Sequence, residues 1–431
     1  MTRLWSPSAV LLLSICVHAH AGESYWPRFR GPNGAGISDA TTVPAKWTDQ
    51  DYNWKVKLPG MGHSSPVVWG NRLFVTCCDA KTALRMLLCL DAATGKTLWQ
   101  RDYPSKTFRQ HQDNTYAAAS PAADADGVII AWSTPDEVVL VALDGEGKDA
   151  WRRGLGPWVG SHGTGSSPII ADGLVILAND QEDPKAIPSM YGPNPTIPAG
   201  KSSLVAVDRK TGETRWQLER KTRMSAYSTP CISPSVEGKP EVIVSSTAHG
   251  VTGVDLATGT VNWEVGNVFN DRCVGSPVVA PGLAIAGYGA GVSGALFVAV
   301  QPGLKTKGIE PKIAYQLKAP VPLVPTPVVK DGRLFLWSDN GAVACLKVET
   351  GETVWREKVG GSFYGSPVWV DGRLYCIAKN GEVVVLAAAD KFEPIARIPL
   401  GEASFATPAV ADGVMYLRTR TQLFSLGGKR P

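Results

Sequence analysis

The sequence predicts an all-β fold, an eight-bladed β-propeller built from four-stranded antiparallel blades. Two observations carry this prediction: a short Ser/Thr-Pro pattern recurs along the chain, and a Gly repeatedly stands four residues before a Trp. The 45 Gly and 32 Pro residues favour many turns over long helices. The prolines of the repeat are spaced 40 to 62 residues apart, which suits four-stranded blades. The eight copies are Ser65-Pro66, Ser120-Pro121, Ser167-Pro168, Thr229-Pro230, Ser276-Pro277, Thr326-Pro327, Ser366-Pro367 and Thr407-Pro408.

Within each unit the signals follow one order. An apolar strand comes after the Pro, then a turn such as Asp172-Gly173, a second strand, and a third strand that ends in Asp. The Gly-x3-Trp element follows, so the Trp lies on the fourth, outermost strand, where it can wedge between neighbouring sheets. The tight turn before it requires Gly because that position needs a positive φ. These tryptophans are Trp99, Trp151, Trp216, Trp263 and Trp355.

The last unit predicts how the ring closes. It stops at Leu423-Phe424-Ser425-Leu426 with no fourth strand, and residues 53–56, which contain Trp54, resemble that missing strand. Ring closure by this N-terminal strand would remove the open edge of the propeller. Blade five has no clear Gly-x3-Trp element and places Tyr315 in the Trp position, and blade seven substitutes residues 390–398.

The N-terminus predicts export. A charged start, an apolar stretch and Ala19-His20-Ala21 indicate a signal peptide over residues 1–21. A lipobox that would anchor the chain through Cys16 is the weaker alternative, because the bulky Ile15 precedes that Cys. We expect an N-terminal extension over 22–52, the propeller over 53–431, and no transmembrane segment. The product would lie in the periplasm or outside the cell.

The charge distribution argues against a nucleic-acid partner. The formal net charge is +4, and 43 basic residues are interleaved with 39 acidic ones instead of forming a run.

Residues 88–99, Leu-Cys-Leu-Asp-Ala-Ala-Thr-Gly-Lys-Thr-Leu-Trp, resemble the pyrroloquinoline-quinone (PQQ) repeat. The resemblance covers essentially the whole mature chain and implies a propeller. It implies less about function, because the family includes quinoprotein alcohol dehydrogenases, which bind the quinone and calcium on the axis. It also includes propellers similar to the scaffold subunit of the outer-membrane barrel assembly machinery, which bind no quinone. Residues 26–34 further look like the start of a group of exported bacterial repeat proteins.

Cys77 and Cys78 are the sharpest enzymatic signal, because quinoprotein dehydrogenases resemble this chain in carrying an adjacent Cys pair beside the cofactor. Exported proteins favour disulfides, and a strained vicinal disulfide is seldom kept without use. Alternatively, neighbouring Cys side chains point to opposite faces of a strand as inert thiols. No residues match the calcium ligands or catalytic Asp of that class, and no C-x-x-C-H motif for haem is present. We expect no cofactor and no metal, with PQQ plus calcium as the alternative.

A candidate binding site lies at the axial mouth. The residue three before each repeat Pro should sit on the innermost strand near the axis, and the loops 101–116 and 180–203 should enlarge the same face. The aromatic members suit a planar or sugar-like ligand, or alternatively plug the channel. Arg109, His111, His162 and Arg272 lie in loops of that face and could add charge. The eight axial residues are His63, Ala118, Gly165, Tyr227, Val274, Val324, Tyr364 and Phe405.

The repeated Ser/Thr hydroxyls are not expected to be nucleophiles. A nucleophile is needed once, whereas a hydroxyl that caps the backbone is needed in every blade. The leading hypothesis is therefore an exported binding or scaffold propeller that presents one face to a protein or small ligand. The alternative is a PQQ-dependent oxidoreductase acting on alcohols or sugars.

Overall fold

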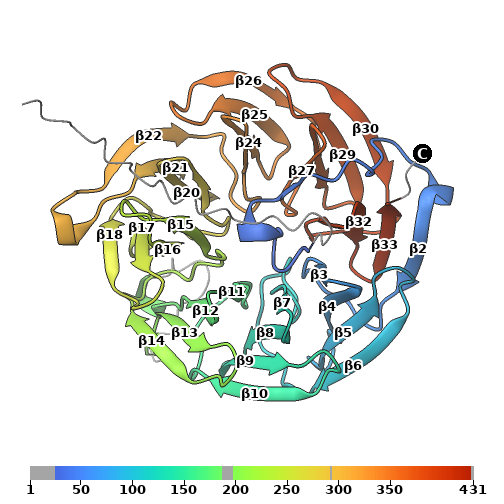
Figure 1. Ribbon diagram of the computed structural model, residues 1–431, viewed down its shortest axis with the longest axis horizontal. Helices are drawn as coiled ribbons and strands as arrows, with labels where there is room; N and C mark the ends of the chain where they lie inside the picture. Colours follow the sequence, from blue (N-terminus) through green and yellow to red (C-terminus); the bar gives the residue numbers. More distant parts are fainter. Residues whose placement is uncertain (1–24, 187–197, 292–293, 429–431) are drawn as a thin grey trace, which may run out of the picture.

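The computed structural model describes residues 25–186, 198–291 and 294–428. Within these ranges the chain forms eight antiparallel sheets of four strands around a central axis, and one sheet gains an extra parallel strand (Figure 1). The helices in the described ranges are 3₁₀ turns of three residues, such as η1 (Pro32–Gly34). The predicted all-β, eight-bladed propeller is confirmed.

Blades one to seven run from their innermost to their outermost strand in chain order. Blades one and two contain β3 (Val67–Trp69), β4 (Arg72–Cys78), β5 (Arg85–Asp91), β6 (Thr97–Tyr103), and β7 (Ala122–Asp124), β8 (Gly127–Ser133), β9 (Val138–Leu143), β10 (Asp149–Gly154). Blades three and four contain β11 (Ile169–Ala171), β12 (Leu174–Asn179), β13 (Ser203–Asp208), β14 (Thr214–Glu219), and β15 (Cys231–Pro234), β16 (Pro240–Ser246), β17 (Gly250–Asp255), β18 (Val261–Val265).

The second half repeats this order. Blades five and six contain β19 (Val278–Ala280), β20 (Leu283–Gly291), β21 (Gly294–Gln301), β22 (Lys312–Lys318), and β23 (Val328–Lys330), β24 (Arg333–Trp337), β25 (Ala342–Lys347), β26 (Thr353–Lys358). Blades seven and eight contain β27 (Val368–Val370), β28 (Arg373–Ile377), β29 (Glu382–Ala387), β30 (Pro394–Pro399), and β31 (Ala409–Ala411), β32 (Val414–Arg418), β33 (Gln422–Gly427), β2 (Tyr52–Lys57).

The tryptophans of the repeat join one blade to the next. Trp99 on β6 donates its indole N–H to the carbonyl of Gly145 in blade two, at 3.0 Å. Its ring lies against Gly147, where an added Cβ would come within 2.6 Å of Trp99 Cδ2. Gly147 also has a φ of +79°, so two separate constraints select Gly at this turn. Trp151 and Trp216 make the same indole-to-carbonyl bond to the next blade.

Trp263 lies between two blades as predicted, but it makes a different hydrogen bond from the other tryptophans. Its buried side chain packs in a cluster that includes Ala286 and Val298 of blade five, and its Nε1–H donates to Glu241 Oε1 of its own blade at 3.0 Å. The physical reason lies in blade five, where β21 and β22 are joined by the longer connection 302–311 with the 3₁₀ turn η5 (Lys305–Lys307), which replaces the short Gly turn of the first four blades. Tyr315 takes the Trp position as predicted, because its hydroxyl donates to the carbonyl of Val348 in blade six at 2.7 Å.

The N-terminal strand closes the ring. β2 pairs antiparallel with β33, with Trp54 opposite Ser425, and completes blade eight. Trp54 donates its indole N–H to Ala92 in blade one at 3.1 Å. The closure between the first and last parts of the propeller therefore uses the same contact as Trp99, Trp151 and Trp216.

The extension before β2 crosses one end of the axis, where Figure 1 shows η1 at the centre of the ring. Trp26 exchanges backbone hydrogen bonds with Val68 of blade one, and β1 (Ile37–Ser38) pairs in parallel with β27 of blade seven. The Asn33 side chain pairs with the backbone of Ile232 in blade four. One segment thus fastens blades on opposite sides of the ring.

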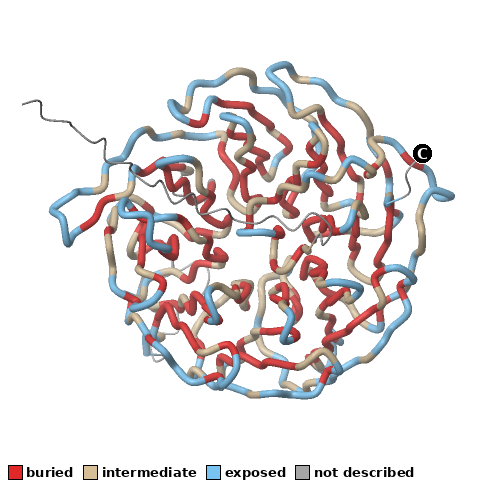
Figure 2. Tube along the Cα trace, in the orientation of Figure 1, coloured by how far each residue is buried: buried red, intermediate tan, exposed pale blue. Residues whose placement is uncertain are grey.

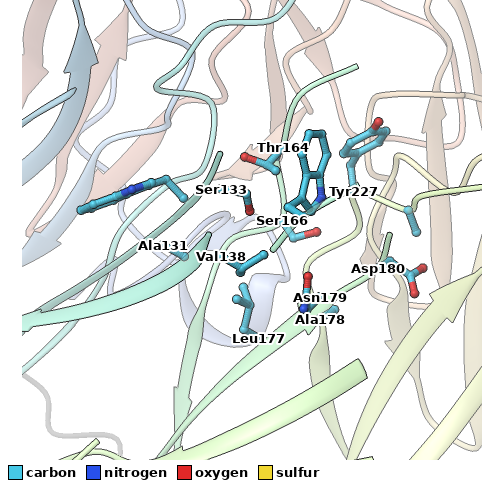
Figure 3. A pocket seen from close by; sticks show the side chains of 14 residues that line it. Ala131, Ser133, Val138, Thr164, Ser166, Leu177, Ala178, Asn179, Asp180 and Tyr227 are labelled. Carbon is cyan, nitrogen blue, oxygen red and sulfur yellow. The ribbon is translucent and has the colours of Figure 1, made fainter. Parts of the chain in front are cut away.

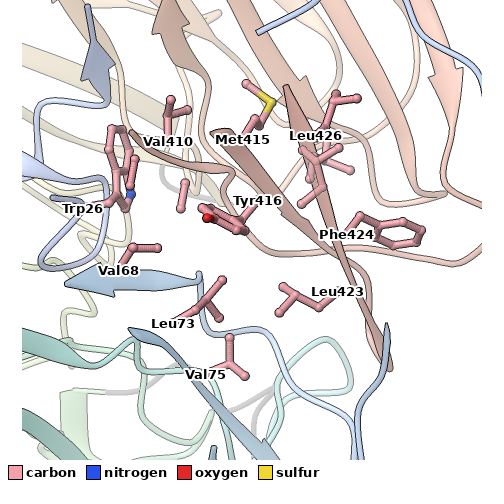
Figure 4. Packing of buried hydrophobic residues seen from close by; sticks show 14 of the residues in the cluster. Trp26, Val68, Leu73, Val75, Val410, Met415, Tyr416, Leu423, Phe424 and Leu426 are labelled. Carbon is pink, nitrogen blue, oxygen red and sulfur yellow. The ribbon is translucent and has the colours of Figure 1, made fainter. Parts of the chain in front are cut away.

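The apolar core lies between and within the blades, while the outermost strands are largely exposed (Figure 2). In the cluster at the closure, Trp26 of the extension packs with Val68 and Leu73 of blade one and with Met415 and Tyr416 of blade eight (Figure 4). The extension therefore contributes to the core as well as to the backbone pairing.

Candidate functional site

The eight Ser/Thr residues of the repeat form a closed ring of hydrogen bonds around the axis. The backbone N–H of Ser65 donates to the Ser120 hydroxyl, the N–H of Ser120 donates to Ser167, and the pattern continues through all blades. The N–H of Thr407 donates to Ser65 Oγ and closes the ring. The eight distances run from 2.8 to 3.3 Å. Each hydroxyl therefore caps the backbone of the neighbouring blade.

A cavity of about 360 Å³ lies on the axis. Its lining contains all eight hydroxyl residues and all eight residues that the sequence placed at the axial mouth. Phe29 of the extension belongs to the same lining, and its neighbours Arg28 and Arg30 bind carbonyls of Pro230, Thr326 and Pro327, which follow or belong to the ring. The extension therefore occupies the axis on one side of the ring, and the loop residues line the other.

Aromatic rings gather on one wall of the cavity. The His63 ring stacks on Phe405 with centroids 4.4 Å apart, and Tyr364 packs edge-on against Phe405. The Lys379 ammonium lies 4.2 Å from the Tyr364 ring centroid. Asp113 accepts hydrogen bonds from the Tyr364 hydroxyl at 3.1 Å and from Lys379 Nζ at 3.0 Å. The loop before blade two is thereby tied to blade seven across the mouth.

The opposite wall is polar. Arg272 donates to Glu182 Oε1 at 2.7 Å, and both side chains are buried. The Ser225 hydroxyl donates to Glu182 and lies 2.9 Å from the Tyr227 hydroxyl, so Tyr227 joins the same network. The His111 and His162 rings stack with centroids 5.2 Å apart. Sequence reasoning missed Glu182, because nothing in the sequence marks a single acid within a long loop as the partner of Arg272.

Burial keeps two of the histidines neutral. Desolvation, reinforced by Arg418 and Arg420, lowers the pKa of His63 to about 3. Desolvation and Arg272 lower the pKa of His162 to about 4. His63 Nε2 is buried and has no hydrogen-bond partner within the described ranges.

The remaining candidates lie elsewhere. Arg109 is exposed and does not belong to the cavity lining. Cys77 and Cys78 end β4, are buried, carry no disulfide, and also lie outside that lining. The Cys77 sulfur instead accepts a contact from Arg418 Nη2 at 3.6 Å. Of the predicted loop 180–203, residues 187–197 lie outside the described residues, as does the predicted signal peptide with Cys16.

A smaller pocket lies beside the axial cavity, between blades two and three (Figure 3). Thr164, Ser166, Asn179 and Tyr227 are among its lining residues, and its volume is about 20 Å³. That volume holds a water molecule but no larger ligand. The axial cavity is thus the candidate binding site.

Fold and cavity together define an eight-bladed propeller with an occupied axis on one side of a hydroxyl ring and a cavity on the other. The family model described as outer membrane protein assembly factor BamB matches residues 85–300 and 310–391, more than half of the chain. The chain belongs to this family of PQQ-repeat propellers.

Individual relatives are distant. Outer membrane protein assembly factor BamB of Yersinia pestis is 24% identical over 327 residues, which cover 75% of this chain and 63% of that protein. The chain spans 60% and 63% of the lengths of the curated relatives from Moranella endobia and Yersinia pestis.

Two solved structures show the same fold. The BamB structure from Moraxella catarrhalis has a TM-score of 0.56 at 15% identity and covers 86% of this chain and 95% of its own. The quinohemoprotein alcohol dehydrogenase from Comamonas testosteroni has a TM-score of 0.66 at 13% identity, covering 95% of this chain and 81% of its own. At these identities the likeness concerns the fold alone. In the described ranges, no helix has the length and apolar composition needed to cross a membrane.

Proposed function

We propose that this chain is an exported propeller that serves as a protein-interaction scaffold, and that its partner binds the face carrying the axial cavity. Membership in a family described as an assembly factor supports the scaffold role. The observation that carries the choice of face is the asymmetry of the axis. The extension fills one side of the hydroxyl ring, whereas the other side carries a cavity bordered by loop residues such as Asp113, His162 and Arg272.

The architecture suits this role. The blades are locked to one another by backbone-to-hydroxyl bonds, Trp contacts and the extension, so the scaffold holds the loops in place. Binding residues commonly lie on loops that a rigid scaffold positions. Side-chain bonds between loops hold the mouth in one arrangement and lower the entropic cost of binding. Examples are the hydrogen bond from Tyr364 to Asp113 and the ion pair of Arg272 with Glu182.

Site-specific photo-crosslinking in the native host tests the choice of face. A photoreactive residue at Lys106 or Gln112, both exposed in the loop after β6, should yield a common adduct with one protein. The same residue at Lys96 or Lys210, exposed in turns at the opposite ends of the blades, should not. Adducts from Lys96 and Lys210 alone, or from none of the four positions, would overturn the proposal.

Export is part of this proposal and rests on residues 1–21. Expression of the full chain in a bacterium should give a protein in the periplasmic fraction whose N-terminus is Gly22. A mass that includes a lipid on Cys16 would replace this arrangement with a lipoprotein. Retention of residues 1–21 in a cytoplasmic product would contradict export.

Quinone-dependent oxidation of alcohols or sugars ranks second. The axial position and aromatic wall suit a planar group, but the residues do not fit a quinone held with calcium. No cluster of three or more His, Cys, Asp or Glu side chains able to hold a metal occurs in the described ranges. Retention of PQQ by the purified protein after incubation with PQQ and calcium, with a matching change in absorbance, would reverse this order.

A further inference from the structure

The hydroxyl ring presents hydrogen-bond donors to the axial cavity. A Ser or Thr hydroxyl has one hydrogen to donate and two lone pairs. Each of the eight oxygens accepts a backbone N–H from the preceding blade, with distances from 2.8 to 3.3 Å. Within the described ranges none of these eight hydroxyls has a protein acceptor for its own hydrogen, and all eight line the cavity. The bonded N–H groups polarise the hydroxyls and make them better donors.

Three buried guanidinium groups surround this ring. Arg30 is fully buried and donates to the carbonyls of Thr326, Pro327 and Pro367, which belong to or follow ring residues. Arg28 donates to the carbonyl of Pro230. Arg418 is fully buried and donates to the carbonyls of Ser64 and Thr76, next to His63 and Ser65 of the cavity.

These three arginines have no carboxylate partner among the residues that the structure describes. In the part of the chain that the structure describes, their bonds go to carbonyl, hydroxyl and sulfur atoms, and none forms an ion pair. Burial lowers the pKa of Arg28 to about 10 and that of Arg30 to about 9, so both remain charged at neutral pH. Uncompensated buried charges are costly, and the field that they create acts on the adjacent cavity.

The other charges of the cavity largely cancel. Arg272 is paired with Glu182, and Lys379 is paired with Asp113. The Asp271 carboxylate accepts the backbone N–H of Arg272 at 2.8 Å, and it is the remaining acid of the lining. A further carboxylate, Asp339, accepts the backbone N–H groups of the lining residues Leu323 and Val324. Three guanidiniums next to the ring therefore outnumber the carboxylates Asp271 and Asp339, and we expect a net positive charge beside the ring.

We propose that the axial cavity binds the carboxylate of an acidic peptide segment of the partner, with the carboxylate oxygens on the hydroxyl ring. This inference rests on the proposed scaffold function and adds the chemistry of recognition. A carboxylate offers only acceptors, which matches a ring of donors in a positive potential. The His63, Tyr364 and Phe405 rings beside the ring would contact an aromatic or aliphatic neighbour of the acid.

The cavity size favours a short anchor over a whole domain. A volume of about 360 Å³ lies at the lower end of the range for small-ligand sites, about 300–1,000 Å³. One or two side chains of a segment would enter it, while the loops around the mouth contact the rest of the partner. The carboxylate would then match the ring by its charge, and the neighbouring side chain would match the aromatic wall by its shape.

The first experiment measures anion binding by the mature protein with ¹⁹F NMR. Trifluoroacetate should broaden on addition of the protein, whereas the neutral trifluoroethanol should not. The peptide N-acetyl-Gly-Phe-Glu-Gly-amide should displace trifluoroacetate at least tenfold more effectively than the same peptide with Gln in place of Glu. Equal binding of both fluorinated probes, or equal displacement by both peptides, would overturn the carboxylate site.

A variant that fills the cavity locates the site. Gly165 lies in the lining, and an added Cβ there meets only the Tyr227 side chain, at 3.7 Å or more. Gly165→Phe should abolish trifluoroacetate binding with no large change in the unfolding temperature. Gly266→Phe makes the same change in a loop outside the lining, at a position where an added Cβ meets only Glu264, and should bind like the parent. Undiminished binding by a folded Gly165→Phe protein would refute the axial location.

Two further outcomes separate the sources of the carboxylate and the two proposals. If acetate or N-acetylglutamate displaces trifluoroacetate as well as the Glu peptide does, free organic acids are the ligand and the peptide source is wrong. If Gly165→Phe leaves the photo-crosslinks from Lys106 and Gln112 unchanged, the scaffold function stands and the axial inference falls. If Gly165→Phe loses both the crosslinks and the binding of trifluoroacetate, the result supports both the scaffold function and the axial carboxylate site.

Discussion

The indole ring of Trp54 lies on Gly95, and its N–H bonds to the carbonyl of Ala92 in the same turn. A Cβ at Gly95 would come within 2.7 Å of Trp54 Cδ2. The first blade thus receives its Trp from a strand that belongs to the last one, and the ring is closed by the contact that Trp99, Trp151 and Trp216 make elsewhere.

Gly95→Ala should destabilise the fold by more than the cost of its φ of +71°. Gly173 provides the matched control, because its φ is +72° and an added Cβ meets nothing within 4 Å. We expect Gly173→Ala to cost about 1 kcal/mol, from backbone strain alone, and Gly95→Ala about 2–4 kcal/mol, because the indole must also move. Chemical unfolding measures both. In a Trp54→Ala background the difference between the two costs should shrink to the smaller contribution of Val56 Cγ1, which an added Cβ would approach to 3.0 Å. An undiminished difference would show that Trp54 is not the cause.

Ser276→Ala should destabilise the protein by about 1–3 kcal/mol, because the buried N–H of Thr229 loses its acceptor at 2.9 Å. Ser276→Thr keeps the hydroxyl and matches the residue found at this position in three other blades, so it should cost less. Denaturant titration of both variants tests this. Equal effects of Ala and Thr would mean that the ring hydrogen bond contributes nothing.

Stability should fall on acidification in part because of His63. Its folded pKa of about 3 is below the ordinary value of 6.5, so the unfolded chain binds a proton that the folded chain rejects. The contribution is present above pH 6.5 and is lost as the pH falls towards 3. His63→Gln should reduce the loss of unfolding free energy between pH 7 and pH 4 by up to about 3 kcal/mol. Parallel stability curves for parent and variant over this range would contradict the buried, neutral state of His63.

Cys77 and Cys78 should be unreactive thiols in the folded protein. They are 0% and 1% exposed, and burial raises the pKa of both. A thiol reagent such as DTNB should label neither residue until denaturant is added, when all seven described cysteines should react. A mass two hydrogens lower, mapped to the Cys77–Cys78 peptide, would instead establish the vicinal disulfide of the quinoprotein hypothesis.

The repeating features were predictable because each depends on a short stretch of sequence. Ser65 and its counterparts, the Gly-x3-Trp elements and the orphan strand around Trp54 follow from spacing alone, and they determined the number of blades and the closure. The residues near the axis followed from their fixed offset to the Pro.

Features that depend on a single long-range partner were not predictable. Trp263 keeps the repeat spacing but turns to Glu241, because blade five lacks the receiving turn. Arg30 reads as part of a motif, yet its partners are carbonyls of Thr326, Pro327 and Pro367, far along the chain. The pairing of Glu182 with Arg272 likewise depends on how two loops meet. Arg109 lies outside the cavity although the loop after β6, to which it belongs, contributes His111 and Asp113 to the lining.

The ring that runs from Ser65 through Thr407 and back has a direction, since every blade donates to its successor and accepts from its predecessor. No position in it is a start or an end. Each blade supplies one N–H donor and one hydroxyl acceptor to the ring. If gene duplication adds a blade or deletion removes one, the blades on either side can still bond to each other without any new residue. The number of blades can therefore change during evolution while every N–H group of the central ring keeps a hydroxyl acceptor.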